Sequence, residues 1–247
     1  MGAASYSSSN ENSMKRFLTA EWRDLVMANY TVDPALLRPL VPAGCELDLF
    51  EGKCFASLVG FMFLNTRVLG IPVPFHVNFE EVNLRFYVRR ETDGEVRRGV
   101  VFVKEIVPRR AIAFIARTLY GEPYEAWKMC NVRNAREVGY SWELASCSNS
   151  IAVERSENIG VPDADSHGEF IIEHYWGYTR RGEKRTDEYK VEHPKWELFS
   201  TRNEKIDVDF AGTYGERFAF LSGTEPYSIL LAKGSEIAVF KGQNISI

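Results

Sequence analysis

The stretch FEEVNLRFYV, residues 79–88, alternates between apolar and polar side chains. The apolar set is Val82, Leu84, Phe86 and Val88, and the other set is Glu81, Asn83, Arg85 and Tyr87. Successive side chains of a strand point to opposite faces, so the stretch is predicted to be a strand with two unlike faces. If the sheet curls into a barrel, the polar row lines its interior and marks a cavity. If the apolar row forms the core instead, the polar row faces solvent, and alternation alone favours that second interpretation.

The next run along the chain, GVVFVKEIV at residues 99–107, is rich in β-branched residues and predicts a largely buried strand. A turn at Asp93-Gly94 joins the two strands. Pro108 then opens a helix that ends at Gly121, a typical C-cap residue. Its apolar residues recur at helical spacing, at Ile112, Ile115, Ala116 and Leu119.

The rest of the chain adds strands and one short helix. Asp33 followed by Pro34 is a typical helix start, and Glu51-Gly52 predicts a hairpin turn. Residues 70–74, GIPVP, are predicted to be a loop, because proline cannot donate to a central strand. Strand-like runs cover residues 19–32, 45–63, 141–147, 151–155 and 170–179, and further apolar runs cover 190–199 and 227–239. Many strands with two helices predict the α+β class.

The composition excludes several classes of protein. A formal net charge of -4 argues against nucleic-acid binding, which needs a basic face. No apolar run approaches the roughly 20 residues of a membrane span. The four cysteines lack metal-ligand spacing, so no metal site is predicted. A disulfide framework is not predicted either, because a chain this long can build an adequate core without one. Residues 1–13 lack the apolar core of a secretory signal and are predicted to be a disordered leader before a single domain, residues 14–247. We expect a cytoplasmic protein, and the leader leaves an organelle open.

Two arginines, Arg109 and Arg110, fall in the first turn of the helix after Pro108. The positive end of a helix dipole disfavours cations, so the pair is unfavourable there unless an anion or a nearby acid compensates. Free helix N–H groups and arginine side chains together predict a receptor for a carboxylate or phosphate. Solvated guanidinium groups, or pairing with a structural acid such as Glu105, explain the pattern equally well.

Lys104 and Glu105 end the preceding strand, and alternation puts them on opposite faces, so at most one enters a given cavity. A lysine in an apolar cavity is a candidate Schiff-base nucleophile, although an edge or surface position is commoner. His174 is best interpreted as a histidine hydrogen-bonded among aromatic residues. His193 lies near Trp196 and is a candidate pocket residue.

Several segments resemble the YqjF-like proteins, a family of unknown function. They are YTVDPALLRPLVPAGCELD from Tyr30, SLVGFMF from Ser57, IPVPFHVNFEEVNLRFYV from Ile71, Ala116-Arg117, Pro123-Tyr124 with Met129 downstream, and VEHPKW from Val191. The resemblance implies an acetoacetate decarboxylase-like fold: a strand-rich, mostly antiparallel barrel-like sheet that encloses a cavity, with a few short helices.

The resemblance also exposes a departure from the decarboxylase. That enzyme carries a glutamate, a short spacer and Pro-Lys-Lys, whose first lysine forms the Schiff base, whereas this chain has Glu105 followed by Pro108-Arg109-Arg110. Tyr30 stands where the decarboxylase has an arginine. Because arginine is not an amine nucleophile at neutral pH, the decarboxylase mechanism does not carry over.

Three functions remain open after this comparison. The first is an enzyme that acts on a small carboxylate or keto acid, with no cofactor. Its candidate acid, base or nucleophile is Glu81, Glu105 or Lys104, and its candidate substrate-binding residues are Arg109, Arg110, Arg85, Asn83, Tyr30 and His193. The second is a protein that binds or senses a small organic anion without turnover. The third is a structural role in which the charged row faces another subunit, and homo-oligomerisation stays open.

Overall fold

The computed structural model describes residues 15–246, apart from residues 73, 75, 93, 145 and 146. The predicted leader and Asp93 of the predicted turn lie outside the described residues. The strands are β1 (Arg16–Val32), β2 (Glu46–Leu47), β3 (Cys54–Val68), β4 (Ile71–Pro72), β5 (Phe79–Thr92), β6 (Glu95–Val107), β7 (Tyr124–Ala126), β8 (Lys128–Arg133), β9 (Glu137–Leu144), β10 (Cys147–Gly160), β11 (Trp176–Arg180), β12 (Arg185–Glu192), β13 (Leu198–Asp207), β14 (Ser228–Phe240) and β15 (Gln243–Ser246). The α-helices are α1 (Pro34–Leu37), α2 (Arg110–Tyr120), α3 (His167–Ile172) and α4 (Phe210–Tyr214), and 3₁₀ turns cover Arg38–Leu40 and Glu216–Gly223.

Seven strands form a closed ring in the order β12, β11, β6, β5, β3, β1 and β14. Two residue pairs, Val191 with Val239 and Glu192 with Ala238, join β12 to β14 and close it. Neighbouring strands in the ring are antiparallel except β6 and β11. The predicted strand-rich, mostly antiparallel α+β fold is therefore confirmed.

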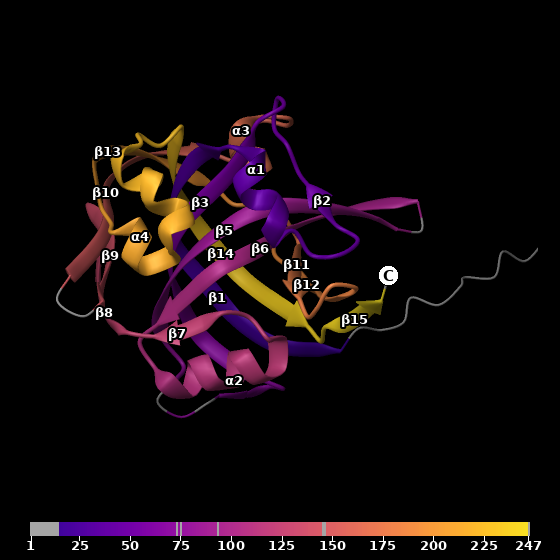
Figure 1. Ribbon diagram of the computed structural model, residues 1–247. Coiled ribbons are helices and arrows are strands. Elements are labelled where there is room, and N and C mark those ends of the chain that lie inside the picture. Colours follow the sequence, from indigo (N-terminus) through magenta and orange to yellow (C-terminus); the bar gives the residue numbers. More distant parts are fainter. Residues whose placement is uncertain (1–14, 73, 75, 93, 145–146, 247) are drawn as a thin grey trace, which may run out of the picture.

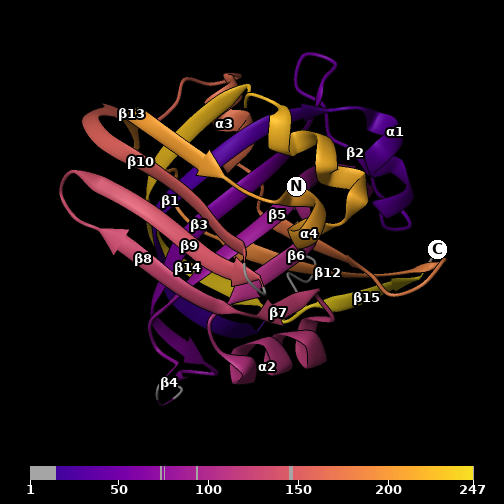
Figure 2. The ribbon, with the colours of Figure 1, turned by 60° about the vertical axis from the view of Figure 1, so that its left-hand side comes forward.

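A second layer of strands covers one outer side of the ring. The sheet continues from β14 through β13, β10, β9 and β8, and these strands lie over β1, β3 and β5 (Figure 2). Apolar residues such as Tyr140 and Trp142 of β9 pack there against Val26 of β1 and Leu84 of β5. A separate core lies inside the ring, and Phe61, Val100 and Tyr189 belong to it. Beneath the second layer, β1, β3 and β5 therefore bury residues on both of their faces.

Asp24 ties the second layer to the ring. It lies in an irregular part of β1 with a left-handed backbone, φ 54°. Its carboxylate accepts hydrogen bonds from Arg133 of β8 and Arg155 of β10, and its backbone carbonyl accepts one from the Tyr140 hydroxyl at 2.8 Å. Asp tolerates left-handed backbone better than most residues, so the same residue supplies both the bend and the charge.

Helices lie at both ends of the ring, with α2 at one end and α3 at the other (Figure 1). The predicted start of α1 is present, since the Asp33 side chain accepts a hydrogen bond from the backbone N–H of Ala35 at 2.8 Å. In α2, Gly121 is the C-cap at φ 65°, as its position predicts. The predicted apolar spacing of this helix also depended on residues 115, 116 and 119. Their side chains are outside the described part of the structure.

Three local predictions are wrong. The predicted strand over residues 170–179 begins as α3, because Ser166 caps a helix by accepting from the backbone N–H of Glu169 at 3.2 Å. Residues 71–72 of the predicted loop form β4, a two-residue edge strand on β3. The hairpin predicted at Glu51-Gly52 is limited to a single bridge between Phe50 and Lys53. The strand before it, β2, pairs with β5 instead of β3.

Candidate functional site

A cavity of about 90 Å³ lies inside the ring. Most of its wall is apolar, with Trp22, Phe61, Phe63 and Phe102 among the lining residues. Its polar side chains come from β5, β6, the segment after α2, the segment after α3, and β12; they are Glu81, Asn83, Arg85, Glu105, Glu122, Tyr124, His174 and Tyr189. Polar groups concentrated in an otherwise apolar, enclosed space are typical of a small-molecule site.

The polar row of β5 faces this cavity rather than solvent. Glu81 is 2% exposed and Asn83 is 1% exposed, while the apolar row packs under the second layer of strands. The solvent-facing interpretation that alternation alone favours is therefore wrong for this strand. Alternation separates the two faces of a strand but does not distinguish an enclosed face from an open one.

A β-bulge in β6 brings Glu105 into the same cavity. Asn83 pairs with Glu105 and Arg85 pairs with Phe102, so three residues of β5 are matched by four residues of β6. The extra residue lets Phe102 and Glu105 both point inward, although strict alternation would separate them. Lys104 then points outward, as the prediction of opposite faces requires.

Three glutamates form a buried cluster at the α2 end of the cavity. Glu81 accepts hydrogen bonds from Asn83 Nδ2 at 3.0 Å and from the Tyr124 hydroxyl at 3.1 Å. Glu122 accepts one from the Tyr189 hydroxyl at 2.6 Å. The carboxyl groups of Glu105 and Glu122 also hydrogen-bond each other. Two carboxyls in contact require a proton between them, so the cluster retains at least one proton.

Burial controls the protonation of this cluster. It raises the pKa of Glu81 to about 8, against the opposing effect of hydrogen bonds from Asn83 and Tyr124. Burial, followed by the charges of Glu122 and Glu81, raises the pKa of Glu105 well above its usual range. The pKa of Glu122 is also raised by burial. Carboxyl groups that hold protons near neutral pH can act as general acids.

A different set of charges occupies the α3 end. Arg85 reaches toward α3, where an Nη2 donates to the carbonyl of Ile171 at 3.4 Å. His174 Nε2 lies 3.1 Å from Asp48, whose carboxylate also accepts from Arg98 Nε at 2.7 Å. Burial lowers the pKa of His174 to about 4, although the hydrogen bond with Asp48 opposes the shift. The imidazole is therefore neutral at physiological pH.

Three buried polar atoms of residues in the cavity wall have no hydrogen-bond partner in the described part of the chain. They are Asn83 Oδ1, Arg85 Nε and His174 Nδ1. Buried polar groups are almost always paired, because an unpaired one costs about 1–3 kcal/mol. Their convergence on one small cavity indicates that a polar ligand completes them.

The other residues singled out in the sequence lie elsewhere. Lys104 pairs with Glu125 at 3.0 Å and lies over the Trp127 ring, outside the cavity lining. Arg109 and Arg110 are exposed at the start of α2 and do not line the cavity.

Tyr30 and His193 also lie outside the cavity lining. Tyr30 packs edge-on against Phe210 in the outer core, on the far side of β1. His193 stacks on Trp196 with ring centroids 4.1 Å apart. The structure thus brings Glu81, Asn83, Arg85 and Glu105 together and separates them from the remaining candidates.

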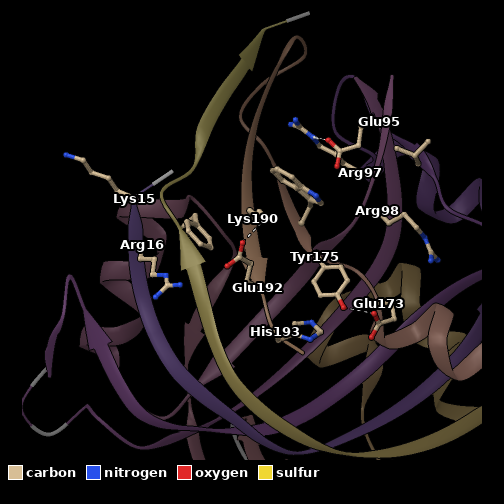
Figure 3. A pocket seen from close by; sticks show the side chains of 13 residues that line it. Lys15, Arg16, Glu95, Arg97, Arg98, Glu173, Tyr175, Lys190, Glu192 and His193 are labelled. Atoms are coloured by element: carbon tan, nitrogen blue, oxygen red, sulfur yellow. Dashed lines mark hydrogen bonds and ion pairs between the residues drawn. The ribbon is translucent and has the colours of Figure 1, made fainter. Parts of the chain in front are cut away.

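An open groove of about 1540 Å³ lies beside the ring, and Figure 3 shows the charged side chains that line it. Many of these charges are already paired, for example Lys190 with Glu192 at 2.9 Å and Arg97 with Glu95 at 3.2 Å. Trp176 lines both the groove and the inner cavity, so it forms the wall between them. The buried polar atoms identify the cavity, rather than the groove, as the site.

Sequence reasoning missed Glu122, Tyr124 and Tyr189, and assigned His174 no role in the site. Glu122 and Tyr124 follow α2 and reach the cavity because β7 pairs with β6, a contact with no short-range signal in the sequence. Tyr189 and His174 belong to aromatic stretches that also suit an ordinary core. Among the described residues, no group of three or more His, Cys, Asp or Glu side chains is arranged to hold a metal ion, and no helix is long and apolar enough to cross a membrane.

The ring of strands and its enclosed cavity define the class of the protein: an acetoacetate decarboxylase-like fold. An acetoacetate decarboxylase-like enzyme from Sphingomonas wittichii RW1 matches with a TM-score of 0.61 at 15% identity, covering 94% of each chain. The enduracididine biosynthesis enzyme MppR complexed with pyruvate matches with a TM-score of 0.63 at 14% identity, covering 97% of this chain and 93% of its own.

The chain itself belongs to the DUF2071 family, described as an uncharacterized conserved protein, which it matches over residues 19–236. It is 29% identical to the uncharacterized protein YqjF of Bacillus subtilis (strain 168) over 192 residues, which are 76% of this chain and 77% of that relative. The predicted resemblance to YqjF-like proteins and to the decarboxylase fold is confirmed.

Proposed function

We propose that the protein is an enzyme that transfers protons on a small organic carboxylate, such as a 2-oxo acid, bound inside the ring. The observation that supports this most directly is the convergence of Arg85 and buried, proton-holding carboxyl groups on one cavity with unpaired polar atoms. The cavity is far smaller than the ~300–1,000 Å³ of drug-sized sites, which favours a ligand of few atoms. A solved structure of MppR, which shares the fold, has pyruvate bound.

In this proposal each end of the cavity has one task. Arg85 binds the carboxylate of the substrate, because its guanidinium carries the charge and has an unpaired N–H. A protonated carboxyl, Glu105 or Glu81, donates its proton to the carbonyl oxygen of the substrate. An ionised carboxyl of the same cluster takes a proton from the neighbouring carbon. The C–H electron pair becomes the new C=C bond, the carbonyl oxygen becomes a hydroxyl, and an enol results.

A Schiff base has no place in this reaction. Lys104 pairs with Glu125 outside the cavity, and no lysine is among the described residues that line it. The carboxyl cluster replaces covalent activation with general acid–base chemistry, which typically contributes 10²–10⁴-fold to a rate. Treatment with borohydride in the presence of 2-oxo acids should accordingly leave every lysine unmodified.

Proton exchange in heavy water tests the proposal directly. Pyruvate and 2-oxobutyrate are incubated with the protein in D₂O, and loss of the C3 proton signals is followed by ¹H NMR. We expect exchange above the rate without protein, at least about 100-fold slower in Glu105→Gln, and lost at low substrate concentration in Arg85→Met. Arg109→Met is the matched arginine variant and should exchange like the wild type.

Two other results would overturn the enzyme proposal. If the acids raise the melting temperature through Arg85 but no deuterium enters them, the protein binds small anions without turnover. If the wild type neither binds these acids nor exchanges their protons, and Arg109→Met and Arg85→Met give the same result as the wild type, the cavity has no role with these acids.

A further inference from the structure

We propose that His174, oriented by Asp48, selects ligands that carry a hydroxyl on the carbon next to the carboxylate. The substrate class is then the small 2-hydroxy acids, together with the enol form of a 2-oxo acid. This inference rests on the proposed function, because it places the same carboxylate on Arg85.

Asp48 determines which nitrogen of His174 carries the hydrogen. The Asp48 carboxylate lies 3.1 Å from His174 Nε2 and also accepts from Arg98 at 2.7 Å. Burial alone would raise the pKa of Asp48, but these two hydrogen bonds outweigh it and lower the pKa. An ionised carboxylate can only accept, so the hydrogen of the neutral imidazole sits on Nε2. Nδ1 is left with a lone pair.

The His174 ring is held in place by its neighbours. Its side chain is 1% exposed. The ring of Tyr87 lies 4.7 Å away and the ring of Phe170 lies 5.2 Å away, measured between centroids. Nδ1 is buried without a partner in the described residues, and His174 lines the cavity. A buried lone pair on a residue of the cavity wall is satisfied when the ligand supplies a hydrogen-bond donor.

The anion-binding group lies on the same wall. The guanidinium of Arg85 is 5.7 Å from the centroid of the Tyr87 ring, the ring that also contacts His174. In the proposed binding mode, the carboxylate of the ligand binds Arg85 and its adjacent carbon faces Nδ1. A hydroxyl on that carbon donates to Nδ1, whereas a methylene would leave Nδ1 unpaired. The carbonyl oxygen of a 2-oxo acid gains a hydrogen to donate only when a carboxyl of the cluster protonates it, so Nδ1 favours the enol over the oxo form. Sites built to bind a hydroxyl reject analogues without one strongly.

Calorimetric titration with two acids that differ by one hydroxyl tests the selection. Lactate, as both enantiomers, and propionate are titrated into wild type, His174→Phe and Arg85→Met. We expect wild type to bind one lactate enantiomer at least about 10-fold more tightly than propionate. His174→Phe should lose that difference through weaker lactate binding alone, while Arg85→Met weakens both acids. His76→Phe, on the segment before β5 and outside the cavity lining, should match wild type.

The outcomes separate the inference from the proposed function. Equal binding of lactate and propionate that still depends on Arg85 overturns the selection by His174 and leaves the anion site intact. Binding of neither acid, with normal folding, overturns the inference, and proton exchange into pyruvate then decides the proposed function separately. ¹⁵N NMR of the histidines, with the His174 signals assigned from His174→Phe, shows which ring nitrogen carries the hydrogen when no ligand is present. We expect a protonated Nε2 and an unprotonated Nδ1 between pH 5 and 8. A protonated Nδ1 would contradict the inference.

Discussion

The carboxyl group of Glu81 lies in the ring where an ordinary strand would place an apolar side chain. Its two donors, Asn83 and Tyr124, satisfy both oxygens but do not compensate for the loss of water, so its pKa rises to about 8. The folded protein therefore holds this proton more tightly than the unfolded chain does. Protonation of one residue is linked in this way to the stability of the whole protein.

Glu81→Gln should change how stability depends on pH. Between the unfolded pKa of about 4.3 and the folded pKa of about 8, the folded state binds more protons, so the free energy of unfolding should fall as pH rises. One such group contributes a slope of up to about 1.4 kcal/mol per pH unit. Urea unfolding at pH 5, 6, 7 and 8 should show a flatter dependence for Glu81→Gln than for wild type.

The matched control for this experiment is Glu80→Gln, one residue earlier on β5 and on its outer face, where Glu80 accepts from Asn131 at 3.3 Å. It should keep the slope of wild type. If both variants show the same slope as wild type, the Glu81 proton is not taken up on folding, and only Glu105 would remain as the proposed acid.

Single residues show where sequence reasoning ends. The types and spacing of Glu81, Asn83 and Arg85 were sufficient to mark them as one polar row. Arg109 and Arg110 had an equally good local argument, yet they lie exposed outside the cavity lining. Whether a helix terminus faces the cavity depends on the rest of the fold, and nothing local determines that.

At the scale of elements, the contact between β11 and β12 positions the acid cluster. Gly177 pairs with Tyr189 across the two strands, and the Tyr189 hydroxyl binds Glu122. A Cβ at Gly177 would lie 2.1 Å from Cζ of the Tyr189 ring. Only a glycine lets this ring cross its partner strand and reach into the cavity.

Gly177→Ala should therefore displace Tyr189 and release Glu122. We expect a loss of about 1–3 kcal/mol in the free energy of unfolding, typical of overpacking, together with reduced proton exchange on the substrate. Gly182→Ala is the control, since nothing lies within 4 Å of the Cβ it would add. Denaturant unfolding checks the stability, and unchanged stability in Gly177→Ala would show that Tyr189 is free to move.

Elements with strong local signals were predictable and others were not. The cap of α1 at Asp33, the C-cap of α2 at Gly121 and the alternation of β5 all depend on residues close in sequence. The helix α3 was missed because Phe170, Ile171 and Ile172 are all buried in the end of the ring, and contacts from several strands override the alternating pattern. The bulge in β6 was missed because it exists only relative to β5.

For the whole molecule, closure of the ring predicts where the backbone is most protected. β3 and β5 have paired neighbours on both sides and bury both faces, whereas β15 pairs only with β12 and is largely exposed. Hydrogen–deuterium exchange read by mass spectrometry should be slowest in residues 54–63 and 79–88 and fast in residues 243–246. Strong protection of residues 243–246 would instead indicate that another chain covers this edge.

The sequence by itself determined the strand-rich class, the ends of two helices and the polar row that lines the cavity, because these depend on backbone preferences and on periodicity within a few residues. Only the tertiary structure decided that this row faces a closed interior, that Glu122 and His174 join it from distant segments, and that the arginine in the cavity is Arg85. The physical reason is that enclosure, burial and the resulting pKa values belong to the closed ring, which joins residues far apart in the chain.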